Sequence, residues 1–390
     1  MHYHEHKPSK LDGIAQQAGV YDAGDALPWN DKVARVIMAV EGGLVTGAPG
    51  TGKSYLIKTL QSMLTARGEK FYTCAYTHAA ARLVGGVTVA HLLHLDKRLR
   101  NAWLLVDEVS LLPIDTLGAI ARLQMVGAKI VLFGDFDGQF EAFADRWSEV
   151  SYDSVQSSEL LHNMCGGMHI HMKEYRRGKD QKLFDRFTSL YEKGDEEVLQ
   201  LAREAQAAYP LRVPFTEVQT VLCVSHNFRM LINTRQNAAL SAAEEARGVH
   251  TVQLAWEGED LKGTTCQPQN MTIWEGIRLI GCPRGSGKVS LGVVQGVVYV
   301  VKQISDTHAT LEMTREYCKD PTKPPDPLTK EVVAVPLDDV AEVLRLTHAL
   351  CYYTCQGRTM DSHVVLMDTE YKWFSRRALI VGLSRGPTGT

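Results

Sequence analysis

The chain has 390 residues, enough at about 100–200 residues per domain for two or three domains with cores of their own. Hydrophobic residues make up 45% and charged residues 22%, which are ordinary globular values and exclude a disordered or fibrous chain. The 42 Lys and Arg residues stand against 45 Asp and Glu, so a net charge of −3 offers no overall basic field for nucleic acid. The longest apolar stretches fall short of the ~18 residues that a spanning helix needs, and we expect no membrane partner.

Eight cysteines are scattered along the chain without a CxxC pair or a regular framework. This distribution is typical of reduced thiols, and it predicts an intracellular protein of the cytoplasm, the nucleus or a viral replication site. The first 26 residues contain alternating histidines without an apolar signal core, so we interpret them as a solvated tail.

The first α/β pattern runs from about residue 33 to residue 135. Residues 43–46 are predicted as a buried strand, and residues 53–66 as a helix with one apolar face. Residues 71–76, 103–106 and 129–133 are further apolar runs, each ending at polar residues. Strands that alternate with helices predict a parallel sheet with ligand chemistry at its carboxyl edge.

A second strand-rich series follows, with predicted strands at residues 218–224, 364–367 and 378–381. Between them, residues 272–336 are rich in valine, glycine and turn signals, which predicts a small antiparallel β-barrel inserted into the second domain. The fold class is therefore α/β with two parallel-sheet domains. The predicted limits are a tail at 1–26, a first domain at 27–160, a second domain at 161–271 and 337–390, and the barrel at 272–336.

The strongest single motif is Gly47-Ala-Pro-Gly-Thr-Gly-Lys-Ser54, which fits G-x-x-x-x-G-K-[ST] between a predicted strand and a predicted helix. In such a loop, backbone N–H groups and the helix N-terminus face a triphosphate. Lys53 then neutralises the β- and γ-phosphates, and Ser54 can ligate Mg²⁺. The residues expected around the nucleotide are Gly47, Gly50, Thr51, Gly52, Lys53 and Ser54.

Two further strand ends carry groups suited to hydrolysis. The strand ending in Asp107 and Glu108 places one carboxylate near Mg²⁺ and another where it can orient or deprotonate water. The next strand leads into Gly134-Asp-Phe-Asp-Gly-Gln139, in which the Gln139 amide can sense the γ-phosphate. Together these motifs predict an enzyme that hydrolyses a nucleoside triphosphate with Mg²⁺.

The order of these and later motifs resembles superfamily 1 helicases, specifically the RecD-like branch that includes the petite integration frequency helicases. The resemblance extends from about residue 27 to residue 385, nearly the whole chain. The matching segments are residues 76–82, 87–91, 107–110, 174–180, 225–227 with Asn233, 356–359 with Asp361, and 381–385. Seven elements in the family's order are far more specific than any one of them.

The resemblance implies two RecA-like motor domains, with the inserted barrel in the second. It implies that Gln356 and Gly357 contact the nucleotide, and that Arg176 and Arg385 reach its phosphates across the domain cleft, opposite Lys53. It also implies a set of single-strand contacts. These are Thr77, His78 and His91 in the first domain and Asn227 and Thr359 in the second.

The implied function is an ATP-dependent single-stranded DNA translocase or helicase with 5′-to-3′ polarity, active with accessory proteins in DNA replication or repair. A viral-type superfamily 1 RNA helicase and a nucleic-acid-binding module with a decayed ATPase remain as alternatives. Three departures from the family pattern bear on this choice. Asp31 stands where relatives read adenine with glutamine, Gln139 lies one residue late in its element, and Thr354 replaces the lysine of the coupling motif. The link from His91 to Leu104 is also short for a strand-splitting wedge.

Overall fold

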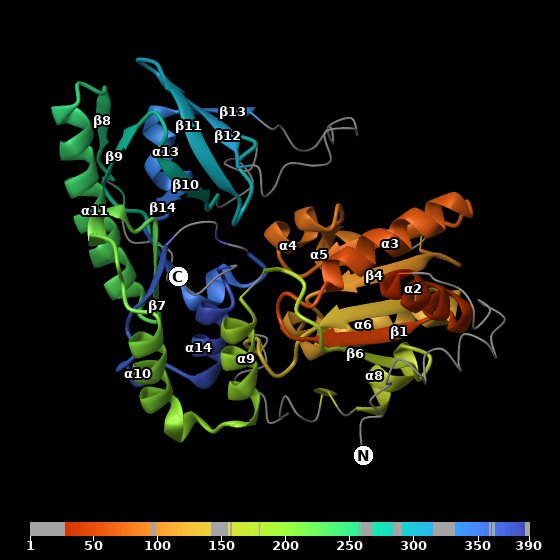
Figure 1. Ribbon diagram of the computed structural model, residues 1–390. Helices are drawn as coiled ribbons and strands as arrows, with labels where there is room; N and C mark the ends of the chain where they lie inside the picture. Colours follow the sequence, from red (N-terminus) through yellow and green to blue (C-terminus); the bar gives the residue numbers. More distant parts are fainter. Residues whose placement is uncertain are drawn as a thin grey trace. The chain divides into compact units, whose positions relative to one another are not determined.

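The computed structural model describes residues 28–94, 99–141, 155–156, 158–178, 180–256, 258, 267–283, 291–314, 332–358, 360 and 363–386. The chain divides into two compact units, residues 1–191 and residues 192–390. Each unit has its own sheets and its own core (Figure 1). Among the described residues, no helix has the length and apolar character that crossing a membrane requires.

The first unit contains a six-stranded sheet in the order β3-β2-β4-β5-β1-β6, and all of its recorded pairings are parallel. Its strands are β1 (Gly43–Gly47), β2 (Phe71–Ala75), β3 (Val87–Thr88), β4 (Trp103–Asp107), β5 (Lys129–Gly134) and β6 (His169–Met172). The predicted strands of this unit are confirmed to within one residue. The reason is that short apolar runs between polar breaks are strong signals of buried parallel strands.

Helices cover both faces of this sheet because its buried strands alternate their side chains between two cores. Leu105 and Val131 face the core under α2 (Trp29–Val40) and α3 (Lys53–Ala66). Leu104 and Leu132 face the opposite core, on the other side of the sheet. The remaining helices of this unit are α4 (His78–Leu83), α5 (Val89–Leu93), α6 (Ile114–Arg122), α8 (Glu159–Met164) and α9 (Gln181–Ser189) (Figure 1).

The first sheet extends past the domain boundary that the sequence predicts at residue 160. Strand β6 pairs in parallel with β1, in the register Val45 to Ile170, and the first unit ends at residue 191. Residues 161–191 therefore belong to the first unit. The polar stretch before β6 resembles a linker in sequence, but β6, which follows it, is an edge strand of the first sheet.

The second unit contains a three-stranded parallel sheet in the order β15-β7-β16. Its strands are β7 (Thr220–Cys223), β15 (Ala349–Cys351) and β16 (Val364–Leu366), and its helices include α10 (Val198–Ala208), α11 (His226–Ala246) and α14 (Arg376–Leu383). Residues 378–381, expected as a strand, lie in α14. Ser375 caps this helix by accepting a hydrogen bond from Ala378 N at 3.3 Å. A short apolar run fits a buried helix as well as a buried strand, so periodicity could not separate them.

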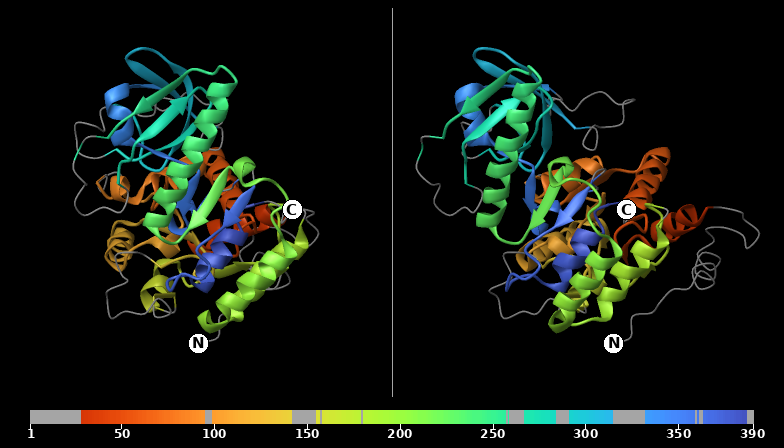
Figure 2. Two further views of the ribbon diagram at one scale, coloured as in Figure 1. Left: turned by 90° about the vertical axis from the view of Figure 1, so that its left-hand side faces the viewer. Right: turned by 60° about the vertical axis from the view of Figure 1, so that its left-hand side comes forward.

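Four strands of the segment predicted as a small barrel, residues 272–336, join a later strand in an antiparallel sheet of the order β13-β12-β11-β10-β14. Its strands are β10 (Arg278–Gly281), β11 (Val298–Ile304), β12 (His308–Met313), β13 (Val332–Pro336) and β14 (Leu344–Leu346). Separately, β8 (Thr251–Leu254) pairs antiparallel with β9 (Met271–Trp274), and α13 (Leu337–Val343) precedes β14. The long helix α11, green in Figure 2, contacts β7, β9 and β15 and so links the two kinds of sheet.

Single turns of 3₁₀-helix connect several of these elements. They are η2 (Val109–Leu111), η3 (Leu123–Val126), η5 (Leu190–Glu192), η6 (Asp195–Glu197), η7 (Phe215–Glu217) and η9 (Tyr352–Cys355). Two of them matter for the site, because η2 follows the paired carboxylates and η5 contains the last two residues of the first unit.

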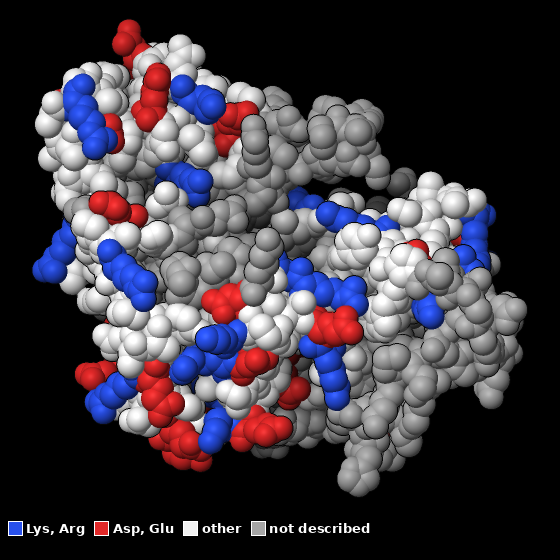
Figure 3. Space-filling model, in the orientation of Figure 1, with Lys and Arg blue, Asp and Glu red and all other residues white. Residues whose placement is uncertain are grey.

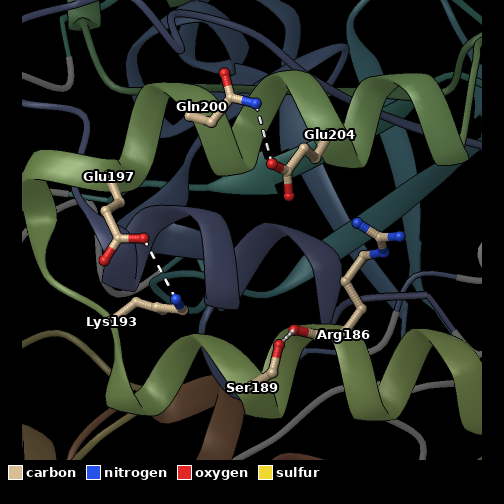
Figure 4. Close-up of polar contacts among 6 residues, drawn as sticks. All are labelled: Arg186, Ser189, Lys193, Glu197, Gln200 and Glu204. Atoms are coloured by element: carbon tan, nitrogen blue, oxygen red, sulfur yellow. Dashed lines mark hydrogen bonds and ion pairs between the residues drawn. The ribbon is translucent and has the colours of Figure 1, made fainter.

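Charged groups of both signs are interspersed on the surface around α10, as Figure 3 shows. Three polar contacts near the ends of α9 and α10 each join residues three or four positions apart, and Figure 4 shows them in close-up. They are Ser189 Oγ to Arg186 O at 2.7 Å, Lys193 to Glu197 at 3.3 Å and Gln200 Nε2 to Glu204 Oε1 at 3.0 Å. Such exposed contacts support single helix turns by tenths of a kcal/mol to about 1 kcal/mol and mark no binding site.

Candidate functional site

The phosphate loop leaves the carboxyl end of β1 and enters α3 in a conformation that requires glycine. Gly47, Gly50 and Gly52 have φ values of 155°, 87° and 101°. A Cβ atom at Gly47 would lie 2.5 Å from the carbonyl oxygen of Met172, and one at Gly50 would lie 2.7 Å from the ring of Tyr175. Because Gly52 carries no side chain to cap α3, the first-turn N–H groups are left for an anion.

Lys53 lies over this loop. Its Nζ donates to the carbonyl oxygens of Gly47 and Ala48, the latter at 3.1 Å, and Thr51 Oγ1 donates to the same Ala48 carbonyl at 2.8 Å. Burial lowers the pKa of Lys53, while the carboxylates of Asp135, Asp107 and Glu108 oppose this shift. The ammonium group therefore lies among backbone carbonyls and carboxylates, and Ser54 follows it on the exposed first turn of α3.

The two predicted carboxylates lie at the end of β4, buried beside the loop. Asp107 Oδ1 accepts a hydrogen bond from Glu108 N at 2.9 Å, and among the described residues nothing donates to its second oxygen. Burial, reinforced by the neighbouring Glu108 carboxylate, raises the pKa of Asp107 to about 7. Glu108 has a φ of 56°, so the chain turns sharply there and presents consecutive carboxylates to one region.

Gln139 reaches Glu108 although its sequence element is one residue longer than the family pattern. Gln139 Nε2 donates to Glu108 Oε2 at 2.8 Å, and Ser110 Oγ donates to Gln139 Oε1. The extra residue is taken up by a turn in which Asp135 Oδ1 accepts a hydrogen bond from Gly138 N at 3.0 Å. Sequence reasoning assigned no role to Ser110, although it lies within the matched Asp-Glu-Val-Ser segment.

Arg176 lies in the first unit, which differs from the predicted contribution across a domain cleft. The backbone N–H groups of Arg176 and Arg177 donate to Gly50 O at 2.8 and 3.0 Å, so this segment packs directly on the phosphate loop. The Arg176 guanidinium lies 2.8 Å from Glu174 Oε2 and 5.3 Å from the ring centre of Trp29. It follows β6, and β6 pairs with the strand that precedes the loop, so both belong to the same body.

The residue buried near the start of α2 is Asn30 rather than Asp31. Asn30 is buried, and its Nδ2 donates to Thr59 Oγ1 at 3.2 Å and to Asp31 Oδ1 at 2.9 Å. Asn30 therefore supplies an amide one position before the place where the sequence comparison expected glutamine. The signal that could have found it is the amide itself, the residue type that relatives use there.

The predicted nucleic-acid contacts of the first unit gather at the carboxyl edge of its sheet. Thr77 caps α4 after β2 by accepting a hydrogen bond from Ala80 N at 3.1 Å, and exposed His78 follows it. Exposed His91 lies on α5, directly after β3, the neighbour of β2. Although His78 is exposed by its surface, the surrounding protein partly desolvates its ring and lowers its pKa, and the neighbouring Arg82 and His91 add to this effect.

In the second unit, the residues predicted at the end of β7 divide into an exposed group and a structural group. Asn227 is exposed in the first turn of α11. Asn233, on the same helix, is buried, and it accepts a hydrogen bond from Ala349 N at 2.8 Å and donates to Ala349 O at 3.2 Å. Asn233 thus joins α11 to β15 and takes no part in an exposed surface. Thr359 and Asp361 lie outside the described residues.

Arg385 is buried, with 2% of its surface exposed, and its position differs from that expected of an arginine finger. Its Nε donates to Val381 O at 2.9 Å, its Nη1 to Cys355 O and Arg358 O at 3.1 and 3.0 Å, and its Nη2 to Ser384 Oγ at 2.9 Å. These bonds join α14 to the turn that precedes Thr359. The guanidinium is therefore a structural group within the second unit.

Gln356 and Gly357 lie in the turn that Arg385 supports. Gln356 is 6% exposed, and neither oxygen nor nitrogen of its side-chain amide has a partner among the described residues. Gly357 has a φ of 71°, which a side chain would strain. A buried amide without partners is costly, so this residue is suited to meeting a ligand group.

Comparisons with known proteins agree with this arrangement. The family model described as an AAA domain matches residues 32–145, and no curated protein matches the chain. The Pif1 helicase from Candida albicans aligns with a TM-score of 0.62 at 19% identity, covering 94% of each chain. Bacteroides Pif1 bound to single-stranded DNA aligns with a TM-score of 0.60 at 17% identity, covering 94% of this chain and 91% of that one. Bacteroides Pif1 in complex with ADP-AlF3 and single-stranded DNA aligns with a TM-score of 0.59 at 18% identity over the same shares. At these identities the likeness shows the fold, so the predicted α/β class with a parallel-sheet RecA-like core is confirmed.

Proposed function

We propose that this chain is an ATP-driven translocase or helicase of single-stranded DNA, moving 5′ to 3′. The observation that carries the proposal is the group formed by Lys53, Asp107, Glu108 and Gln139 around the glycine loop of the first unit. The fold adds support, because similar structures were solved with ADP-AlF3 and single-stranded DNA. The polarity is inferred from the resemblance to that branch.

The residues beside the loop fit Mg²⁺, because Ser54 offers a hydroxyl oxygen and Asp107 a carboxylate oxygen that accepts no hydrogen bond among the described residues. Hard oxygen ligands of this kind are those that Mg²⁺ prefers, and the bound ion would neutralise phosphate charge. Lys53 faces the β- and γ-phosphates from the loop. Buried Asp107 must be ionised to ligate the ion, which Lys53 favours.

Hydrolysis needs a group that takes a proton from the attacking water and a group that orients it. Glu108 is the proposed acceptor of the proton, and Gln139 holds the Glu108 carboxylate by donating to Oε2 at 2.8 Å. Arg176 is the proposed cation for the charge that develops on the transferred phosphoryl group, from its position beside the loop.

Single-stranded DNA is the proposed ligand of the carboxyl edge that carries Thr77, His78 and His91, together with Asn227 and Thr359 of the second unit. We also propose that the antiparallel sheet of the second unit corresponds to the small barrel of this helicase branch, and that accessory replication or repair proteins act with the chain. The proposed location is a reducing compartment, in keeping with the six free, buried cysteines among the described residues.

The decisive experiment measures ATP turnover with Mg²⁺ alone, with single-stranded DNA and with single-stranded RNA. We expect DNA to stimulate turnover most and Lys53→Ala to abolish it, while Lys58→Ala, an exposed lysine on the same helix, stays within twofold of the unaltered chain. Stimulation by RNA alone would favour the RNA helicase alternative. If Lys53→Ala leaves turnover unchanged, the assignment of an ATP-driven translocase or helicase is wrong.

Translocation on strands of defined polarity tests the direction of movement. A forked duplex with a 5′ single-stranded tail tests strand separation in the same buffer. Each base-pair step holds ~1.4 kcal/mol of stacking, and the short link after His91 leaves little chain for a wedge. We therefore expect movement along single strands but poor separation of long duplexes by the isolated chain. Efficient unwinding would show that the short link suffices.

A further inference from the structure

Tyr191 is the last residue of the first unit, and its hydroxyl meets the turn that carries Gln139. It lies in η5, after α9, and its Oη donates to Asp135 Oδ2 at 2.7 Å. The other oxygen of the same carboxylate accepts the hydrogen bond from Gly138 N at 3.0 Å. Asp135 is 2% exposed, so its two oxygens are held by protein donors from two distant parts of the chain.

Gly138 is packed closely between these two groups. A Cβ atom there would lie 2.2 Å from Tyr191 Oη and 2.5 Å from Asp135 Oδ2. A real Cβ atom does not come so close to another heavy atom, so any larger residue would displace the phenol or the carboxylate. Gly138 thus leaves room for the Tyr191 hydroxyl, and Gln139 is the next residue along the chain.

We propose that Tyr191 is a positioning residue that keeps the Gln139 amide against Glu108 during ATP hydrolysis, a role that rests on the proposed function. The contacts run in series. The phenol holds the Asp135 carboxylate, the carboxylate holds Gly138 N, and this turn sets the position from which Gln139 donates to Glu108 at 2.8 Å. A hydrogen bond to a buried charge is stronger than one between neutral groups. Water does not replace the phenol as the donor, so the loss of this bond loosens the turn.

The packing of the neighbouring helix does not depend on this hydroxyl. Phe184 of α9 stacks on Tyr175 with ring centres 4.7 Å apart, and it meets Phe187 edge-on at 5.3 Å. These rings, with buried Leu190, fix the end of α9 on the first unit. Replacing Tyr191 with phenylalanine keeps the ring and removes the hydroxyl that donates to Asp135.

The first test compares Tyr191→Phe with the unaltered chain in steady-state ATP turnover. The matched control is Tyr72→Phe, a half-buried tyrosine on β2 outside this group of contacts. We expect kcat to fall about tenfold, with KM for ATP within twofold and one ADP still bound per chain, because Lys53 and the loop are unchanged. A merely structural role predicts instead that ADP stoichiometry falls in proportion to turnover, and that result would overturn the proposal.

The second test is a double-mutant cycle, measured under single-turnover conditions, between Tyr191→Phe and Gln139→Ala. If Tyr191 acts through Gln139, its removal costs at most twofold once the amide is absent. If the two substitutions instead lower the rate by independent factors that multiply, the proposal is overturned.

Gly138→Ala, which displaces the phenol, should reproduce the tenfold fall in kcat with KM unchanged. Absence of turnover in the unaltered chain would overturn the proposed function and this role with it, whereas turnover that Tyr191→Phe leaves within twofold would overturn the role of Tyr191 alone.

Discussion

Arg176 and Arg385 share a predicted task, but the two units hold them in very different ways. Arg176 lies beside the phosphate loop with 37% of its side chain exposed, and its guanidinium meets the carboxylate of Glu174 and the ring of Trp29. Arg385 is buried in the second unit and donates four hydrogen bonds, three of them to backbone carbonyls. The first arginine has weak surface partners, and the second is part of the interior.

The difference shows that an arginine in a motif does not by itself specify a cation that can meet a substrate. A guanidinium has five N–H donors and no acceptor, so its freedom depends on how many of those donors the protein already uses. Arg176 can leave an exposed carboxylate at little cost. Arg385 cannot turn away without breaking four buried hydrogen bonds, to Val381 O, Cys355 O, Arg358 O and Ser384 Oγ.

The largest expected effect is on turnover, from Arg176→Ala. Arginines that stabilise the transferring phosphoryl group contribute roughly 10³–10⁵ in rate elsewhere, and we expect a fall of at least about 100-fold here. ADP affinity should stay within threefold, because the loop and Lys53 remain. Steady-state turnover and ADP titration measure both quantities, with Arg122→Ala, an exposed arginine of α6, as the control. Equal losses of turnover and ADP affinity would mean that Arg176 does not act on the transferring phosphate.

The next effect is on stability, from Arg385→Ala. Removing the side chain takes a hydrogen-bond donor from each of four buried acceptors, and we expect the free energy of unfolding to fall by about 3 kcal/mol. Urea unfolding measures this, with Arg247→Ala, whose side chain is 71% exposed, as the control. Arg176→Ala should cost less than about 1 kcal/mol in the same assay. If the two variants lose equal stability, the contrast between the arginines disappears.

A smaller effect is expected on the pH dependence of stability. It comes from His348, another buried polar group of the second unit. Burial lowers the pKa of His348 to about 4, and its Nε2 has no partner among the described residues. Because an unfolded histidine titrates near 6.5, the stability from keeping it neutral is complete above about pH 6.5 and is lost as pH falls towards 4. This loss amounts to about 2–3 kcal/mol. His348→Gln should flatten that part of the stability curve, whereas His250→Gln, at an exposed histidine, should not.

The smallest effect comes from Glu174→Gln, which removes the ion pair of Arg176. With 77% of the Glu174 side chain exposed, the pair contributes about 0–0.5 kcal/mol to stability, and we expect no measurable change in unfolding. Turnover should stay within threefold of the unaltered chain, because the arginine loses only a surface partner. A stability loss near that of Arg385→Ala would show that Arg176 is also a structural residue.

The amino-acid sequence by itself determined four strands of the first sheet and the phosphate loop. The helix at residues 53–66 and the strands ending near Asp107 and Gly134 agree with prediction, because local signals define them. These signals are apolar runs that end at polar residues, one apolar helix face, and glycines where φ is positive. Nothing in these patterns depends on what packs against them, and the same holds for the placement of Lys53, Asp107 and Glu108 at one sheet edge.

Only the tertiary structure decided which unit contains Arg176, how the longer turn brings Gln139 to Glu108, and that Arg385 is buried. Each depends on contacts between residues far apart in the chain, such as β6 pairing with β1 or the bonds from Arg385 to Cys355 O and Arg358 O. The same reason explains residues 378–381, where a fully buried apolar run is compatible with helix or strand until its neighbours are known. Motif order places residues near a site, but the hydrogen-bond partners that settle their roles come from elsewhere in the fold.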